Sequence, residues 1–178
     1  MTASALIADK SASSLRNNSA RLDPLSSKAT GHDSPVLQRA EEKARAGNLP
    51  FAGSLNPRDA WGLHLAGDAL IVDVRTAEER KFVGYIPGTA HVAWMTGISL
   101  TRNPRFVKEL ESRVGRDANI LLLCRSGKRS ALAAEAAAKA GFQHVFNILE
   151  GFEGDLDNQQ RRGEFNGWRH TGLPWVQD

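Results

Sequence analysis

The stretch from Leu121 to Ala131 constrains the fold more than any other part of the chain. It reads Leu-Leu-Leu-Cys-Arg-Ser-Gly-Lys-Arg-Ser-Ala and leads into an alanine-rich run that ends at Ala140. The leucines predict the end of a buried strand, and the run from Ser130 to Ala140 predicts a helix. A tight loop between a strand and a helix N-terminus gathers backbone N–H groups at the positive end of the helix dipole. Such a loop is typical of a site that binds an anion.

The only cysteine of the chain, Cys124, opens this loop, and the cations Arg125, Lys128 and Arg129 follow it. A lone cysteine after an apolar strand is often a small buried apolar residue. That interpretation does not account for the cations, because like charges this close repel one another when no anion neutralises them. We therefore expect Cys124 to lie at the mouth of the loop and to be held largely as a thiolate, which is the nucleophilic form.

Length and composition narrow the functional classes. A chain of 178 residues with 41% apolar residues suits one domain with an appendage. The net charge of +3 includes no long stripe of lysine and arginine, so we predict no nucleic-acid partner. One cysteine excludes an internal disulfide and is typical of a reducing, cytoplasmic compartment. The five histidines lack ligand spacing, so we predict no metal and no cofactor. No apolar run approaches the ~20 residues that cross a bilayer, so we predict no membrane partner.

The chain divides into three segments. Residues 1–33 are polar and without hydrophobic period, and we expect a flexible or loosely packed N-terminal extension. A transit peptide is the alternative, but the acidic residues Asp9 and Asp23 count against it. Residues 34–52 are predicted to form a helix, from Ser34-Pro35 to Gly47, and a lead-in. The main domain is predicted at residues 53–178.

Strand and helix patterns alternate through the main domain. One helix is predicted from Asn56-Pro57 to Gly67, and a short one is predicted after Thr76. A third is predicted to begin at Asn103-Pro104, which would cap it, and to end at Gly115. Strands are predicted at Ser54-Leu55, Ala69–Val74, His91–Trp94, Asn119–Leu123 and His144–Leu149. This alternation indicates an α/β fold with an open, mainly parallel sheet of about five strands and helices on both faces.

Asp73 and Arg75 follow one of these apolar runs, at the edge of the sheet where sites gather in open α/β folds. We expect the two side chains to form an ion pair that supports the cysteine loop rather than to act in catalysis.

Four separated motifs resemble those of the rhodanese (thiosulfate sulfurtransferase) family, of the single-domain type, over roughly residues 53–176. The first is Asp73-Val74-Arg75 with Glu78 and Glu79, and the second is the turn Gly84-Tyr85-Ile86-Pro87-Gly88-Thr89, in which Tyr85 stands where histidine is commoner. The third is the loop Cys124 to Arg129, and the fourth is the ending from Gly167-Trp168 to Pro174. The segment from Phe152 to Asn166 departs from the family pattern and resembles an insertion. It is interpreted either as an acceptor-docking loop or lid, or as a solvated surface loop.

The resemblance implies a sulfur relay. The Cys124 thiolate would take the outer sulfur of thiosulfate, and the resulting persulfide would pass it to cyanide or a thiol. The implied partners are a small anionic sulfur donor and a thiol or cyanide acceptor, with an acceptor protein as a further candidate. Arginine directly after the cysteine favours thiosulfate over mercaptopyruvate. The residues expected to bind the substrate are Arg125, Ser126, Gly127, Lys128, Arg129 and Ser130, with Asp73 and Arg75 in support.

Two alternatives stay open at the level of sequence. One is a non-catalytic regulatory or docking module, because fold alone does not fix function. The other is a rhodanese-related cysteine phosphatase. That class needs one more residue between the cysteine and the arginine than stands between Cys124 and Arg129, because the loop must wrap a tetrahedral phosphate.

Overall fold

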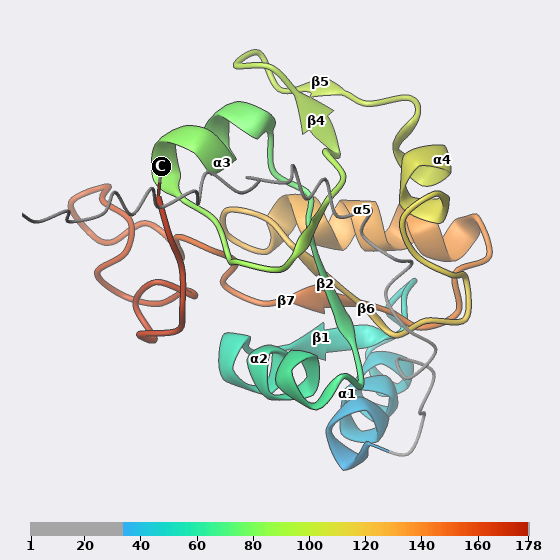
Figure 1. Cartoon of the computed structure of the whole chain (residues 1–178). Coiled ribbons are helices and arrows are strands. Elements are labelled where there is room, and N and C mark those ends of the chain that lie inside the picture. The colour runs from blue at the N-terminus through green and yellow to red at the C-terminus, as the bar shows by residue number, and fades with distance from the viewer. Residues whose placement is uncertain (1–33, 178) are drawn as a thin grey trace, which may run out of the picture.

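The computed structural model describes residues 34–177, so the extension predicted at residues 1–33 lies outside the described part. Five strands form one sheet in the order β1-β7-β6-β2-β3, and every neighbouring pair is parallel (Figure 1). The predicted α/β fold with a mainly parallel sheet is confirmed. The strands are β1 (Gly53–Leu55), β2 (Leu70–Asp73), β3 (Ala90–His91), β6 (Ile120–Leu123) and β7 (Val145–Ile148).

Helices cover both faces of this sheet. They are α1 (Pro35–Ala46), α2 (Pro57–Ala66), α3 (Ala77–Val83), α4 (Phe106–Glu111) and α5 (Lys128–Lys139). Figure 1 shows α1 and α2 on one side of the sheet and α4 and α5 on the other. The strands β4 (Met95–Thr96) and β5 (Thr101–Arg102) form a separate antiparallel hairpin.

The three central strands are buried at all of their positions, which explains why they read as continuous apolar runs. Side chains alternate between two cores, as the pleat of a strand requires. Leu122 packs in one core with Phe106 of α4 and Ala133 of α5. Leu121 packs in the other core, with Leu37 of α1 and Ala60 of α2. The two cores hold the strand β6, and with it the start of the cysteine loop, at the centre of the molecule.

The helix predicted in residues 34–52 is packed tightly against the edge strand β1. Leu37 and Ala40 of α1 are buried in the core beneath it. A Cβ atom added to Gly53 would lie 2.7 Å from the carbonyl oxygen of Ala40, so only glycine permits this approach. The helix α1 is therefore part of the folded unit that the sheet organises.

Several predicted boundaries were wrong. The helix predicted between Asn103 and Gly115 covers only Phe106–Glu111. Asn103 does not cap it, because its Oδ1 accepts a hydrogen bond from the Arg105 backbone N–H at 2.9 Å and forms a turn before the helix. The helix stops early where the Ser112 hydroxyl donates to the Glu109 carbonyl at 2.7 Å and competes with the backbone.

Two other elements also differ from their predicted limits. The helix α5 begins at Lys128 rather than Ser130, because Gly127 adopts a left-handed φ of 82° and starts the helix earlier. The strand predicted at His91–Trp94 pairs as a ladder only over Ala90–His91. Among residues 34–177, no helix has the length and apolar content that a bilayer crossing requires.

Candidate active site

Cys124 follows the central strand β6 directly, at the carboxyl edge of the parallel sheet, and stands four residues before Lys128, the first residue of α5. Gly127 is the residue before that helix, and its left-handed backbone turns the loop into α5. The positive end of a helix of 12 residues therefore faces the cysteine loop. This placement is the one predicted for an anion site.

The expectation that Cys124 lies open at the mouth of the loop was wrong, because the residue is only 1% exposed. Its Sγ has a polar neighbour, since Ser130 Oγ lies 3.2 Å away. That hydroxyl also lies 2.7 Å from Oδ1 of Asn147, on β7. Ser130, in the first turn of α5, is fully buried, and its hydroxyl contacts the sulfur inside the fold.

Arg129 is held by an ion pair that the sequence did not suggest. Its two terminal nitrogens contact both carboxylate oxygens of Glu79 on α3, the closest pair at 2.5 Å. Glu79 thus neutralises one of the three cations that were expected to be neutralised by an anionic substrate alone. Arg129 remains close to the cysteine, but it is not a free substrate-binding cation.

Burial by itself raises the pKa of the Glu79 carboxyl. The hydrogen bonds from Arg129 and from the Thr76 backbone outweigh this effect, so the pKa lies below its ordinary value. The same hydrogen bond raises the pKa of the Arg129 guanidinium. Glu79 is also the residue that closes the capping box of α3 with Thr76. One carboxylate therefore fixes both the start of α3 and the orientation of Arg129.

Arg125 and Lys128 keep their charges uncompensated within residues 34–177, where neither forms an ion pair. Lys128 is exposed, and Arg125 and Ser126 are half-buried. In the described part of the chain, the buried Nε of Arg125 has no hydrogen-bond partner. Two unpaired cations beside a helix N-terminus suit an anion that carries two negative charges.

Asp73 and Arg75 form the expected ion pair, with Arg75 Nη2 2.7 Å from Asp73 Oδ2 and both side chains fully buried. Arg80 contacts the same carboxylate oxygen at 3.0 Å. Burial raises the pKa of Asp73, but the charge of Arg75, its hydrogen bonds and the charge of Arg80 outweigh burial and lower it. The guanidinium of Arg75 also stacks 4.0 Å from the ring centroid of Phe152.

The chain after β7 supports the cysteine loop through its backbone. The Phe152 N–H donates to the Cys124 carbonyl at 2.8 Å, and the Glu153 N–H donates to the Arg125 carbonyl at 2.9 Å. A Cβ atom on Gly151 would lie 2.5 Å from the carbonyl oxygen of Cys124. Gly151 therefore lets the backbone approach the loop closely.

The four motifs that are separated in the sequence meet in the structure. Arg75 Nη2 donates to the Gly84 carbonyl at 2.8 Å, which joins the first motif to the turn. Tyr85 pairs with Val176, two residues after the C-terminal ending, through backbone hydrogen bonds of 2.8 and 2.9 Å, which brings the turn next to that ending. The Trp168 N–H donates to the Gly151 carbonyl at 2.8 Å, which joins the ending to the segment that supports the loop.

The segment predicted as an insertion, Phe152 to Asn166, is a loop with a closed base. Phe152 itself is fully buried and belongs to the core, so the departure begins after it. Asp155 and Asn166 exchange two hydrogen bonds of 2.7 and 3.0 Å that bring the ends of the loop together. Leu156 and Phe165 project from it and are 51% and 68% exposed.

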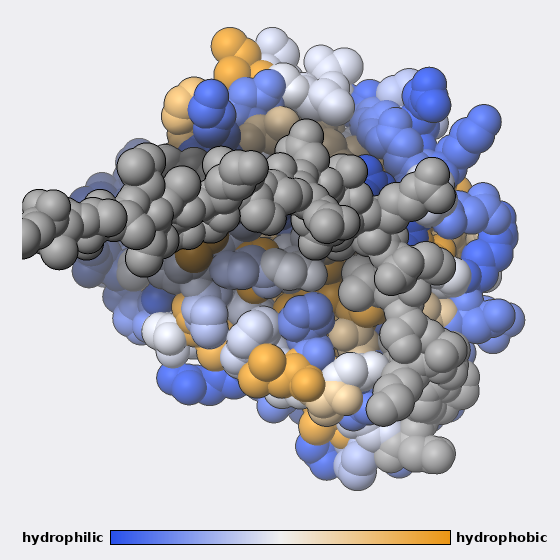
Figure 2. All heavy atoms as spheres, viewed as in Figure 1, coloured by the Kyte–Doolittle hydropathy of each residue, from blue (hydrophilic) through white to orange (hydrophobic). Residues whose placement is uncertain are grey.

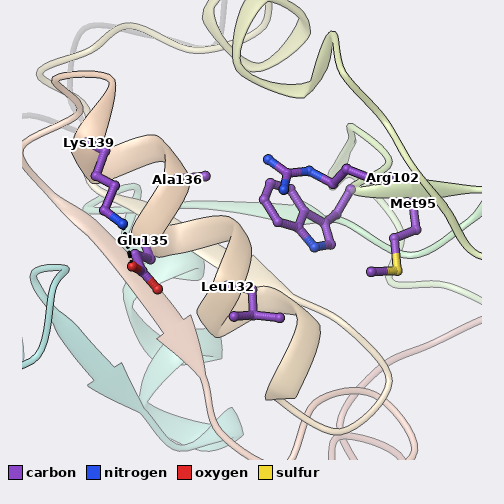
Figure 3. A pocket seen from close by; sticks show the side chains of 7 residues that line it. Met95, Arg102, Leu132, Glu135, Ala136 and Lys139 are labelled. Carbon is purple, nitrogen blue, oxygen red and sulfur yellow. Dashed lines mark hydrogen bonds and ion pairs between the residues drawn. The ribbon is translucent and has the colours of Figure 1, made fainter.

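The cavity shown in Figure 3 has a volume of about 480 Å³ and lies outside the cysteine loop. It is bounded by α5 and the β4–β5 hairpin, and the residues that line it are Trp94, Met95, Arg102, Leu132, Glu135, Ala136 and Lys139. Figure 2 shows hydrophobic spheres at the top of the molecule, over the turn of this hairpin, where Ile98 is 90% exposed. Within residues 34–177, no group of three or more His, Cys, Asp or Glu side chains could hold a metal ion.

Sequence reasoning missed the roles of Asn147 and Gly151 and the pairing of Glu79 with Arg129. Glu79 stood in the first family motif and in the Thr76-x-x-Glu capping pattern, but nothing in the sequence joined it to Arg129, 50 residues later. Asn147 stood out as the one polar residue within an apolar strand. That pattern could have suggested a buried polar partner near the edge of the sheet.

Comparisons with known proteins agree with the observed fold. The profile of the rhodanese-like domain family matches residues 56–157. The chain is 40% identical over 115 residues to the uncharacterized protein RP600 of Rickettsia prowazekii, covering 64% of this chain and 87% of that one. It is 34% identical over 117 residues to thiosulfate sulfurtransferase 16, chloroplastic, of Arabidopsis thaliana, covering 65% and 85%.

Among solved structures, the chain is similar to Rv0390 from M. tuberculosis, with a TM-score of 0.65 and 40% identity over 72% of this chain and 99% of that one. The profile match covers the strands β2, β6 and β7, the cysteine loop and Asp73 with Arg75. The protein therefore belongs to the rhodanese-like domain family.

Proposed function

We propose that the protein is a thiosulfate sulfurtransferase that carries sulfane sulfur as a persulfide on Cys124. The observation that carries this proposal is the position of Cys124, at the end of the central strand and beside the N-terminus of α5, with Arg125 and Lys128 unpaired among the described residues. The similarity to an Arabidopsis protein named thiosulfate sulfurtransferase supports the choice of donor.

In the first half-reaction, the Cys124 thiolate attacks the outer sulfur of thiosulfate. A bond forms between Sγ and that sulfur, the sulfur–sulfur bond of thiosulfate breaks, and its electron pair leaves with sulfite. Charge is conserved, because a thiolate and a dianion become a persulfide anion and the sulfite dianion. Arg125 and Lys128 attract the donor and the departing sulfite.

In the second half-reaction, cyanide or a thiolate attacks the terminal sulfur of the persulfide. The product is thiocyanate or a new persulfide, and the Cys124 thiolate is regenerated. The positive end of α5 stabilises the anion on the enzyme in both states without adding a titratable base. Because Cys124 is buried, we expect it to react with a small inorganic sulfur donor and not with a bulky reagent.

Intact-protein mass after incubation with thiosulfate tests the proposal. Cys124 is the only cysteine of the chain, so an added mass of one sulfur atom is assigned without ambiguity. Added cyanide should remove the adduct and release thiocyanate, and the Cys124→Ser variant should form no adduct. Absence of the adduct in the wild-type protein would favour the docking-module interpretation instead.

The experiment must also distinguish the proposed sulfurtransferase from a cysteine phosphatase. The ion pair between Arg129 and Glu79 counts against it, because that arginine already binds a carboxylate where a phosphatase would need it for phosphate. Release of phosphate from an aryl phosphate, dependent on Cys124, would support the phosphatase over the sulfurtransferase.

A further inference from the structure

We propose that the Ser130 hydroxyl is a two-position hydrogen-bond switch between Asn147 and the sulfur of Cys124, with the Asn147 amide as the partner that accepts in one position and donates in the other. This inference rests on the proposed function for its purpose, since the switch would serve the anionic states of Cys124. The ionisation of the sulfur can be measured whether or not sulfur is transferred.

The geometry places one proton between two acceptors. Ser130 Oγ lies 2.7 Å from Asn147 Oδ1 and 3.2 Å from Cys124 Sγ. A hydroxyl carries a single proton and can donate to only one of them at a time. The distance to Oδ1 is the usual length of an O–H···O hydrogen bond, so in this arrangement the proton points to Asn147. The Cys124 thiol can then donate its own proton to Ser130 Oγ.

When the Cys124 thiol loses its proton to solvent, the sulfur changes from a hydrogen-bond donor to an acceptor. A thiolate only accepts hydrogen bonds, so the Ser130 hydroxyl rotates and donates to Sγ. Asn147 Oδ1 would then face a hydroxyl oxygen with no proton directed at it. Rotation of the Asn147 amide brings its NH₂ group to the same place, where it donates to Ser130 Oγ. The chain Asn147–Ser130–Cys124 is thus satisfied in both states.

Burial makes the choice of residue at this position matter. Ser130 is fully buried and Asn147 is 4% exposed, so bulk water does not complete the hydrogen bonds of either group. An amide is able to accept in one state and to donate in the other. A carboxylate only accepts and would hold the serine proton away from the sulfur. An aliphatic side chain does neither and leaves the serine proton to the sulfur.

The first test is titration of the ultraviolet absorbance of the thiolate in the full-length protein, with the Cys124→Ser variant as the blank. In Ser130→Ala the midpoint pH should rise by about 1–2 units, as loss of a hydrogen bond to a charged group implies. Ser130→Thr keeps the hydroxyl and should restore the wild-type midpoint. An unchanged midpoint in Ser130→Ala would overturn the proposal.

Two substitutions of Asn147 separate capture of the serine proton from simple loss of the amide. Asn147→Asp should raise the midpoint, because a carboxylate holds the serine proton and adds negative charge. Asn147→Leu should leave it near the wild-type value, because Ser130 still donates to the sulfur. Equal shifts in the two variants would contradict the switch. Asn119→Leu is the matched control, since Asn119 is a buried asparagine at the opposite end of β6 and should not move the midpoint.

A measurement on the wild-type protein keeps the test decisive if the Asn147→Asp variant does not fold. The side-chain NH₂ resonances of Asn147 should shift with the same midpoint as the thiolate absorbance, and this shift should vanish in Ser130→Ala. Resonances that stay fixed across the transition would overturn the proposal. A wild-type protein that shows the switch but forms no persulfide with thiosulfate would refute the proposed function alone.

Discussion

Substitution of Gly151 by alanine should inactivate the site without touching any side chain that meets the substrate. The new Cβ would lie 2.5 Å from the Cys124 carbonyl oxygen and 2.6 Å from Arg125 C and Ser126 N. Ordinary contacts begin at 3.4 Å, so the loop backbone would have to retreat by about 0.9 Å. A displacement of about 1 Å at reacting groups lowers rates by about 10²-fold. We expect a loss of that order in thiocyanate formation from thiosulfate and cyanide.

The effect on stability can be separated from the effect on the loop. Gly151 has a φ of 65°, and an alanine in this left-handed region costs about 1–2 kcal/mol. Overpacking against the loop backbone adds about 1–3 kcal/mol. Gly163 provides the matched control, because its φ is 86° but nothing lies within 4 Å of its added Cβ. Gly163→Ala should therefore show the backbone term alone.

Urea denaturation and steady-state kinetics on both variants complete the test. Gly163→Ala should lose about 1–2 kcal/mol in the free energy of unfolding and keep its activity. Gly151→Ala should lose more stability and should also lose activity under conditions in which it remains folded. Wild-type activity in Gly151→Ala, or an equal loss of activity in both variants, would refute the argument that this close approach sets the position of the loop.

Three further predictions concern charge and the outer loop. Glu79→Gln retains the capping box but frees Arg129, so KM for thiosulfate should fall. The free energy of unfolding should fall by about 1–2 kcal/mol, because the partly buried ion pair is lost. The control Glu111→Gln, at an exposed ion pair, should change neither quantity. The pKa values of Asp73 and Glu79 lie below 3.8 and 4.5, so the stability they contribute is complete above about pH 5 and is lost as the pH falls through these lowered values. Denaturation at a series of pH values should show this decline, and a flat profile would contradict it. Replacement of residues 156–165 by a short Gly-Ser linker should preserve folding and activity with cyanide. The reason is that the hydrogen bonds that close the loop lie outside the replaced segment. Loss of activity with cyanide would show instead that the loop shapes the site.

The strands that carry the site were predictable because burial on both faces leaves a direct record in the sequence. Leu70–Asp73, Ile120–Leu123 and Val145–Ile148 each read as apolar runs, and each lies in the centre of the sheet. Helix ends were less predictable where side chains compete for backbone groups. Asn103 carries the signal of a cap, yet its side-chain oxygen Oδ1 accepts a hydrogen bond in a turn before the helix.

The contacts around Cys124 show where local patterns stop being informative. The sequence places cations beside the cysteine but does not reveal that Glu79 pairs with one of them. It marks Ser130 as a substrate-binding hydroxyl but not as a buried group that also meets Asn147. Each of these contacts joins residues that are distant in the chain, and the side chains concerned look ordinary in isolation.

The sequence by itself determined the parallel α/β architecture, the family, and the place of Cys124 between a buried strand and a helix N-terminus. Hydrophobic periodicity and helix-start signals act over a few residues, so they can be read without the fold. Only the tertiary structure decided that Cys124 is buried, that Arg129 is neutralised, and that Gly151 lies directly against the loop backbone. Exposure, charge pairing and close backbone approach depend on which distant segments the sheet brings together, and no local pattern encodes that.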